Sequence, residues 1–157
     1  MNKKMIAFCS WSGGKDSALA LYRAMTGPEY DLDVTHCLNM MNEDGTYSRS
    51  HGIRPGILEA QVEAMGMTLI QQPATWDNYE EKFKEAVAEM KKQGIEAGIF
   101  GDIDLEPHRE WVERVCGEMG IKAFLPLWLG KRKELVNEFL SAGFEAVITA
   151  TNSAIMG

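Results

Sequence analysis

A six-residue stretch near the amino terminus combines two glycines with hydroxyl and charged side chains. Its sequence is Ser12-Gly13-Gly14-Lys15-Asp16-Ser17, and it lies between an apolar segment, 4–10, and a segment expected to be helical, 18–25. Gly13 and Gly14 allow a tight turn in which successive N–H groups point at one anion. The helix that follows adds the positive end of its dipole. The pattern therefore predicts a phosphate-binding loop.

The side chains of this loop indicate how phosphate would be handled. Ser12 and Ser17 offer hydroxyl donors, and Lys15 offers a full positive charge. Asp16 would repel a bare phosphate, so we expect a divalent metal, Mg²⁺, between its carboxylate and the phosphate. The spacing fits neither a Walker A loop nor the Gly-x-Gly-x-x-Gly pattern. The structural alternative is an ordinary glycine turn ahead of a capped helix.

The elements around the loop alternate between helix and strand. Segments with helical spacing of apolar residues end four times at a glycine that precedes a short apolar run, and these glycines are Gly66, Gly94, Gly120 and Gly143. A glycine after a helix supplies a left-handed cap, and such runs are typical of buried strands. With further strands at 5–10 and 34–41, we expect about six strands, the last at 144–148. The predicted fold is α/β, a doubly wound parallel sheet with helices on both faces.

Composition and charge exclude several classes of protein. The chain has 157 residues, which is the size of one domain, and 16 Lys and Arg against 23 Asp and Glu give a net charge of −7. This sign disfavours a nucleic-acid partner. No apolar run approaches the ~18 residues of a membrane helix, and we find no signal peptide, so we expect a cytoplasmic protein. Cys9, Cys37 and Cys116 form no Cys-x-x-Cys pair and are expected to be small buried side chains.

The loop also carries a resemblance to a known superfamily. Ser12 to Ser17 match the Ser-Gly-Gly-x-Asp-Ser signature of the PP-loop, or N-type, ATP pyrophosphatases, whose fold is adenine nucleotide alpha hydrolase-like. The rest of the chain resembles the diphthine–ammonia ligase family and its bacterial and archaeal relatives. The matching stretches are Ser50-His51-Gly52-Ile53, Gly101-Asp102-Ile103, His108-Arg109 with Glu113, and Phe124-Leu125-Pro126-Leu127-Trp128. The resemblance covers essentially the whole chain.

The resemblance implies an activity and a set of site residues. The activity is cleavage of ATP to AMP and pyrophosphate to adenylate a carboxylate, which ammonia then converts to an amide. The residues implied in nucleotide binding are Ser12, Gly13, Gly14, Lys15, Asp16, Ser17, Asn39, Met40, His51, Gly101 and Asp102. Lys15, Asp16 and Arg109 are implied in catalysis, Asp16 as the Mg²⁺ ligand.

Some of these roles have simpler alternatives. Asn39 and Met40 are expected to contact adenine through backbone atoms, and Asp102 is a candidate second metal contact. His51 is placed near the nucleotide or the acyl substrate, but a loop histidine that bonds the backbone is equally compatible with the sequence. Arg109 lies in the first turn of a helix, where a cation hints at an anionic partner, although Glu110 or Glu113 would also satisfy it.

The chain departs from the family pattern in two places. Relatives usually follow the Trp128 position with Gly-Arg-Asp, whereas this chain has Leu129-Gly130-Lys131, so Lys131 or Arg132 would have to serve as the basic group. The second departure is length, because family members continue into a further portion that is thought to serve the acyl substrate. We expect residues 1–157 to be the PP-loop ATP-binding domain without this C-terminal substrate portion.

Three functions therefore stay open, with different partners. The first is the ligase-like enzyme, which takes ATP, a small or protein-borne carboxylate and ammonia. The second is a non-catalytic ATP- or AMP-binding module. The third, a tRNA-modifying PP-loop enzyme, is ranked last because the cysteines are isolated and the net charge is −7. The sequence leaves homo-oligomerisation open.

Overall fold

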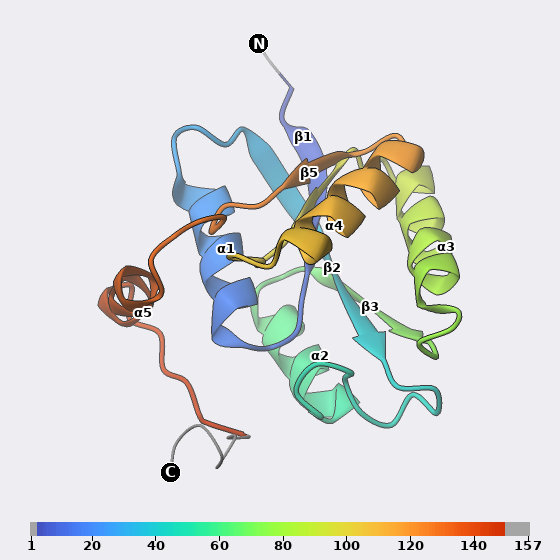
Figure 1. Cartoon of the computed structure of the whole chain (residues 1–157), viewed down its shortest axis with the longest axis horizontal. Helices are drawn as coiled ribbons and strands as arrows, with labels where there is room; N and C mark the ends of the chain where they lie inside the picture. The colour runs from blue at the N-terminus through green and yellow to red at the C-terminus, as the bar shows by residue number, and fades with distance from the viewer. Residues whose placement is uncertain (1–2, 150–157) are drawn as a thin grey trace.

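Strands and helices alternate along the chain in a computed structural model, which describes residues 3–149 (Figure 1). The strands are β1 (Met5–Ser10), β2 (Leu32–Met41), β3 (Thr68–Pro73), β4 (Ala97–Ile99) and β5 (Lys122–Phe124). The helices are α1 (Lys15–Thr26), α2 (Pro55–Ala64), α3 (Tyr79–Lys92), α4 (Glu106–Glu118) and α5 (Arg132–Ser141). All strand pairs are parallel, in the order β3-β2-β1-β4-β5. The predicted doubly wound parallel sheet is confirmed.

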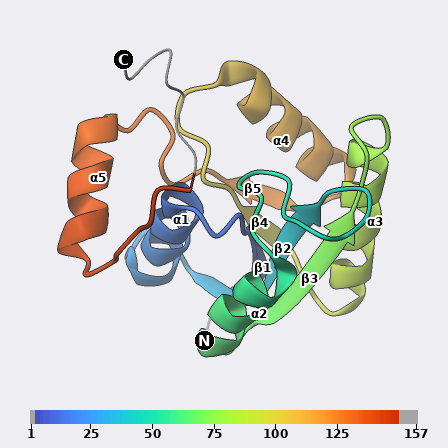
Figure 2. The same cartoon turned by 90° about the horizontal axis from the view of Figure 1, so that it is seen from below.

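Helices cover both faces of the sheet (Figure 2). The buried residues of α1, α2 and α5 share one core cluster, and those of α3 and α4 share the other. Alternation along β1 feeds both clusters, because Ala7 and Cys9 belong to the first and Phe8 to the second. The chain changes face where it crosses from β3 at one edge, through α3, to β4 beside β1.

An irregularity in β2 decides which of its side chains face which helices. The register between β1 and β2 shifts between Ala7, opposite Val34, and Phe8, opposite His36. One extra residue on β2 reverses the alternation. Val34 and Cys37 therefore both join the α1–α2 core although they are three residues apart.

The four glycines expected to cap helices all adopt left-handed backbone conformations. Their φ angles are 71° at Gly66, 97° at Gly94, 70° at Gly120 and 92° at Gly143. After α2, the Gly66 N–H donates to the Glu63 carbonyl at 2.9 Å and the Met67 N–H donates to the Val62 carbonyl at 3.2 Å. This pair of bonds reverses the chain into β3, as predicted from the residue type.

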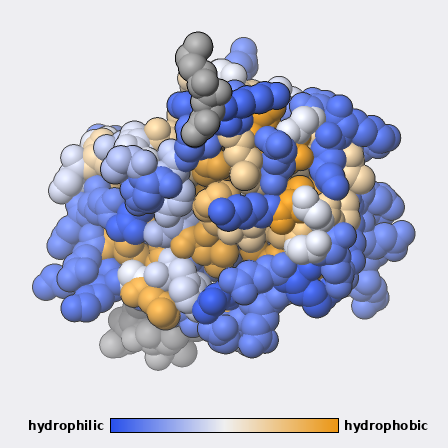
Figure 3. Space-filling model, turned by 90° about the horizontal axis from the view of Figure 1, so that it is seen from above, coloured by the Kyte–Doolittle hydropathy of each residue, from blue (hydrophilic) through white to orange (hydrophobic). Residues whose placement is uncertain are grey.

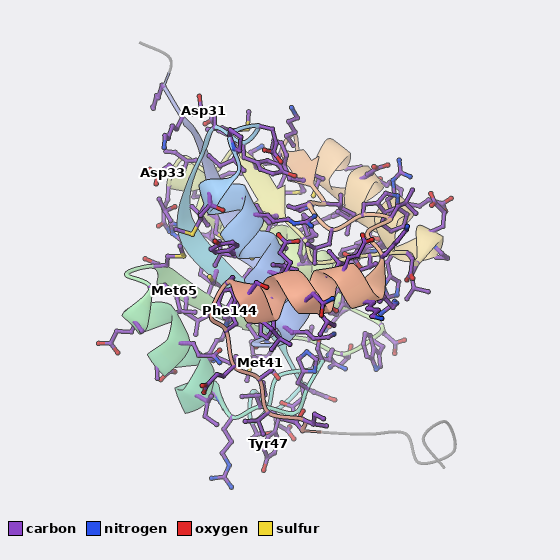
Figure 4. All side chains as sticks on the ribbon, turned by 90° about the vertical axis from the view of Figure 1, so that its left-hand side faces the viewer. Asp31, Asp33, Met41, Tyr47, Met65 and Phe144 are labelled. Atoms are coloured by element: carbon purple, nitrogen blue, oxygen red, sulfur yellow. The ribbon has the colours of Figure 1, made fainter. Side chains whose placement is uncertain are left out.

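The predicted sixth strand is wrong. Residues 144–149 contain no strand, and the sheet of the described chain has five. Phe144 stacks on Phe139 at a centroid distance of 4.9 Å and meets Tyr22 edge-on at 5.8 Å. These contacts hold the segment against α1 and α5, at the end of α5 (Figure 4), rather than beside β5.

The first helix also begins earlier than expected, at Lys15 rather than Ala18.

The ends of the sheet differ in character. Asp31 and Asp33 mark the amino end of β2, whereas Met41 and Tyr47 lie at the opposite, carboxyl end (Figure 4). Seen from the amino end, the surface is hydrophilic around its rim and hydrophobic near its centre (Figure 3). Within residues 3–149, no helix has the length and apolar character needed to cross a membrane.

The cysteines are buried, as predicted. Cys9, Cys37 and Cys116 are all free thiols in the interior. Burial raises the pKa of Cys37 and of Cys116 to about 12, so both stay protonated at neutral pH.

Candidate functional site

The loop between β1 and α1 is held together by its own two serines. The Ser17 hydroxyl donates to the Gly14 carbonyl at 3.1 Å and accepts from the Ser12 N–H at 3.4 Å. The Ser12 hydroxyl accepts from the Gly14 N–H at 3.1 Å and lies 3.2 Å from the Ser17 hydroxyl. Both hydroxyls, predicted as phosphate donors, here hold the loop in shape. The hydrogen-bond donors that remain for an anion are therefore backbone N–H groups.

Backbone N–H groups are available at the start of α1. Gly14 is the N-cap and no side chain caps the helix. In the described structure the N–H groups of Lys15, Asp16 and Ser17 have no hydrogen-bond acceptor. Open N–H groups at the positive end of a helix favour a phosphate or carboxylate. The geometry fits the predicted anion-binding loop.

Both loop glycines are required by their surroundings. Gly13 has a φ of +78°, which side chains with a Cβ rarely adopt. A Cβ on Gly14 would lie 2.4 Å from the His51 Nε2 atom. His51 therefore lies directly against the loop, where the sequence comparison placed it, and its imidazole is one wall of the site.

A return of the chain beside β2 brings His51 to this position. Beyond the end of β1, Ser48 pairs in antiparallel fashion with Met41, and the Arg49 N–H donates to the Met40 carbonyl at 3.0 Å. The buried Ser48 hydroxyl accepts from the Ile53 N–H at 3.0 Å, closing the turn that carries His51. Sequence reasoning missed Ser48, because no local pattern separates it from an exposed loop serine.

Asn39 and Met40, predicted near adenine, are both buried. Their exposed fractions are 3% and 8%, so a ligand would meet backbone atoms rather than side chains. The Asn39 Nδ2 donates to the Trp11 carbonyl at 2.7 Å, and its Oδ1 has no partner among the described residues. The Met40 carbonyl already accepts from Arg49. Asn39 thus orients the start of the loop, and the adenine contacts stay a prediction.

Gly101 and Asp102 approach the loop from the end of β4. A Cβ on Gly101 would lie 3.0 Å from the carbonyl group of Asp16 and from the Ser17 nitrogen, so any larger residue would have to push the first turn of α1 away. β1 and β4 are neighbours whose following helices cover opposite faces, which is where open α/β sheets bind ligands. The Asp102 carboxylate lies 3.4 Å from the His108 Nδ1 atom.

Carboxylates gather beside the charged end of the loop. Lys15 pairs with Asp16 at 3.1 Å, and both side chains are partly exposed. Asp16, Asp102 and Asp104 line one cavity of about 150 Å³ with Gly101 and Arg132. Across the described residues, no three His, Cys, Asp or Glu side chains come close enough to form a metal site by themselves. Mg²⁺ is usually held by one or two carboxylates plus phosphate oxygens, which Asp16 and Asp102 fit.

Arg109, which was predicted to be catalytic, lies outside the cavities beside the loop. Its guanidinium pairs with Glu113 at 3.0 Å and with Glu106 at 3.6 Å, and it lies 5.2 Å from the Trp128 ring centre. The hydrogen bond to Glu113 raises the pKa of Arg109. Arg109 does not line any of the three described cavities to which Lys15 or Asp16 contributes. Its catalytic role stays a prediction that these contacts do not explain.

Arg132 is the cation that the fold does bring to the loop. It pairs with Asp104 at 2.8 Å and lines two cavities together with Asp16. Of the two basic residues that the sequence offered here, Lys131 lies 4.0 Å from Glu134 and lines neither of these cavities. The structure therefore singles out Arg132.

Fold and loop together define the class of this protein. A five-stranded parallel sheet in the order 3-2-1-4-5, with a Ser-Gly-Gly-Lys-Asp-Ser loop at the start of its first helix, is an α/β domain of the PP-loop type. The profile of the diphthamide synthase N-terminal domain matches residues 3–123, and the chain belongs to this family. The resemblance found in the sequence is thereby confirmed.

Other comparisons add little. The chain is similar to the crystal structure of a predicted subunit of tRNA methyltransferase from Methanocaldococcus jannaschii, with 19% identity and a TM-score of 0.49. That match covers 87% of this chain and 74% of the other. No curated protein sequence matches this one significantly.

Proposed function

We propose that this chain binds ATP with Mg²⁺ at the loop of residues 12–17 and cleaves it to AMP and pyrophosphate to activate a carboxylate for amide formation with ammonia. The observation that carries the proposal is the set of unpartnered N–H groups at Lys15, Asp16 and Ser17, at the positive end of α1. Membership of the diphthamide synthase family supports the use of ATP. We further propose that residues 1–157 form the ATP-binding domain.

Each loop residue has a distinct task in this proposal. The open N–H groups and the Lys15 ammonium hold the terminal phosphates and offset their charge. Asp16, with Asp102 across the 150 Å³ cavity, would hold Mg²⁺, which neutralises phosphate charge when bound. The grip on the terminal phosphates leaves the α-phosphorus open to attack.

The chemistry needs little acid–base help from the protein. A carboxylate oxygen of the substrate forms a bond to the α-phosphorus, and the bond to the β-phosphate breaks, so that pyrophosphate leaves with the electron pair. Ammonia then attacks the acyl carbon, AMP departs, and the nitrogen loses a proton to solvent. An ionised carboxylate requires no general base, so catalysis consists of positioning and charge compensation.

ATP binding and product analysis test the proposal. Lys15→Ala and Asp16→Asn should each weaken Mg²⁺-dependent ATP binding by about 10-fold or more, equivalent to about 1.4 kcal/mol. Lys133→Ala, at an exposed lysine on the first turn of α5, is the matched control and should bind ATP normally. Both loop side chains are partly exposed, so the melting temperature should change little.

The products separate the alternatives. Incubation with ATP, Mg²⁺, ammonium and a panel of carboxylic acids should release AMP and pyrophosphate. ADP as the product would overturn the proposal. Tight ATP binding without turnover on any acid would instead favour a non-catalytic nucleotide-binding module.

A further inference from the structure

A second cavity adjoins the loop on the side of α5. It has a volume of about 250 Å³ and lies between α1, the segment after β4, and α5, which crosses α1 (Figure 2). We propose that it binds a short carboxylic acid with an apolar tail, and that this acid is the acyl substrate. The inference rests on the proposed function and names the substrate class for it.

The walls of this cavity are apolar. They are formed by Leu19, Ile103, Leu135, Val136 and Phe139. The volume corresponds to about eight water molecules at ~30 Å³ each, so the occupant is small. Apolar walls contribute through the area that they remove from water and offer nothing to a charged tail. A short aliphatic or branched chain matches them.

The charged groups of the cavity are Lys15, Asp16 and Arg132. Arg132 donates to the Asp104 carboxylate from Nε at 3.3 Å and from Nη2 at 2.8 Å. Its Nη1 has no acceptor among the residues that the structure describes. Asp104 therefore holds the guanidinium in place while leaving donors for a second carboxylate. Lys15 is the other cation, and its ammonium adds attraction for the same charge.

The location connects the acid to the phosphate loop. Lys15 also lines a larger cavity of about 570 Å³, to which Gly13 and Gly14 contribute. A carboxylate at the polar side of the 250 Å³ cavity would thus lie beside Lys15, which lines both this cavity and the larger one at the loop. An acid bound here would present its carboxylate toward the phosphates and bury its tail between α1 and α5.

Hexanoate is a suitable probe, and its binding is measured by calorimetry and by chemical-shift changes in ¹⁵N-labelled protein. Binding should perturb the amides of Leu19, Ile103 and Val136. Hexanol and hexylamine, with the same tail, should bind at least 10-fold more weakly. Equal or tighter binding of hexylamine would show that the carboxylates dominate the cavity and would overturn the assignment.

Two variants locate the probe, with one matched control. Arg132→Gln, at an exposed side chain, should weaken hexanoate binding by about 10-fold. Val136→Trp should fill the cavity and abolish hexanoate binding, and folding is checked by the melting temperature. Lys133→Gln, one position along α5, should bind both ligands as the parent does. Unchanged hexanoate affinity in Arg132→Gln and Val136→Trp would refute the site.

Measuring ATP and hexanoate separately distinguishes the two proposals. ATP binding without hexanoate binding would overturn the acid site alone. Hexanoate binding without ATP binding would overturn the proposed function, and with it the role of the acid as acyl substrate.

Discussion

The two faces of the sheet are built differently. Under α3 and α4, Phe8, Phe83, Phe100 and Trp111 form an aromatic cluster, with centroid distances of 5.1 Å for Phe83–Trp111 and 5.9 Å for Phe8–Phe100. Under α1, α2 and α5, the core adjoins cavities of about 250 and 570 Å³ beside the loop. The first face is packed with aromatic side chains, and the second adjoins the cavities beside the loop. Stability and binding should therefore respond to different substitutions.

The largest effect on stability is expected on the aromatic face. Phe83 is 2% exposed and touches three other aromatic rings. Phe83→Ala should lower the free energy of unfolding by about 3–5 kcal/mol, or the melting temperature by roughly 6–20 °C. Phe83→Leu should cost less, and ATP affinity of the folded variant should be unchanged. A melting curve like that of the parent would contradict the comparison.

The opposite behaviour is expected at the loop. Gly14→Ala places a Cβ 2.4 Å from the His51 imidazole and must displace one of the two. Because small misplacements of a binding loop carry large penalties, ATP affinity should fall by about 100-fold, while the melting temperature changes by only a few degrees. The double variant Gly14→Ala with His51→Ala should recover part of that affinity. Titration of ATP into the parent protein and both variants checks this.

A smaller effect is expected at Leu129, which is strained. Its φ of 62° lies in the left-handed region, and its side chain is 72% exposed. The conformation costs about 1–2 kcal/mol for such a residue, and the greater freedom of unfolded glycine offsets about half of it. Leu129→Gly should stabilise the protein by about 0.5–1 kcal/mol in denaturant unfolding. Gly66→Ala, at a φ of 71° with open space around it, should change stability in the opposite direction.

The smallest effect is expected from the ion pairs between α3 and α4. Hydrogen bonds from Arg114 and Lys84 lower the pKa of Glu80 to about 2. This value is below the ~4.3 of an unfolded glutamate, so the stabilisation is complete above that pH and is lost as the pH falls toward 2. In Arg114→Gln the melting temperature should fall less steeply between pH 6 and 3. High salt should remove most of the difference, since the groups are exposed.

Features fixed by residue type and short-range geometry were predictable from the sequence. The four cap glycines and the loop glycines required a conformation or an approach that only glycine allows. The last apolar run, 144–148, looks like a strand locally, but contacts of Phe144 with α1 and α5 hold it away from β5. Sequence patterns carry no information on such competition between distant partners.

The same limit applies to the site. The resemblance placed His51 and Asp16 at one site, but their positions depend on the return of the chain at Ser48 and on the contact of Gly101 with α1. Arg109 and Arg132 are both arginines near helix starts. Only the fold shows that the first is engaged by Glu113 and that the second meets the loop.

The position of β1 between β2 and β4 determines when the loop can be completed during synthesis on the ribosome. β1 pairs with β4, which lies about 90 residues later, and Gly101 at the end of β4 supports the first turn of α1. At roughly 5–20 residues per second, the nascent loop waits about 5–20 s for this support. We therefore expect the complete site to form only after β4 has left the exit tunnel.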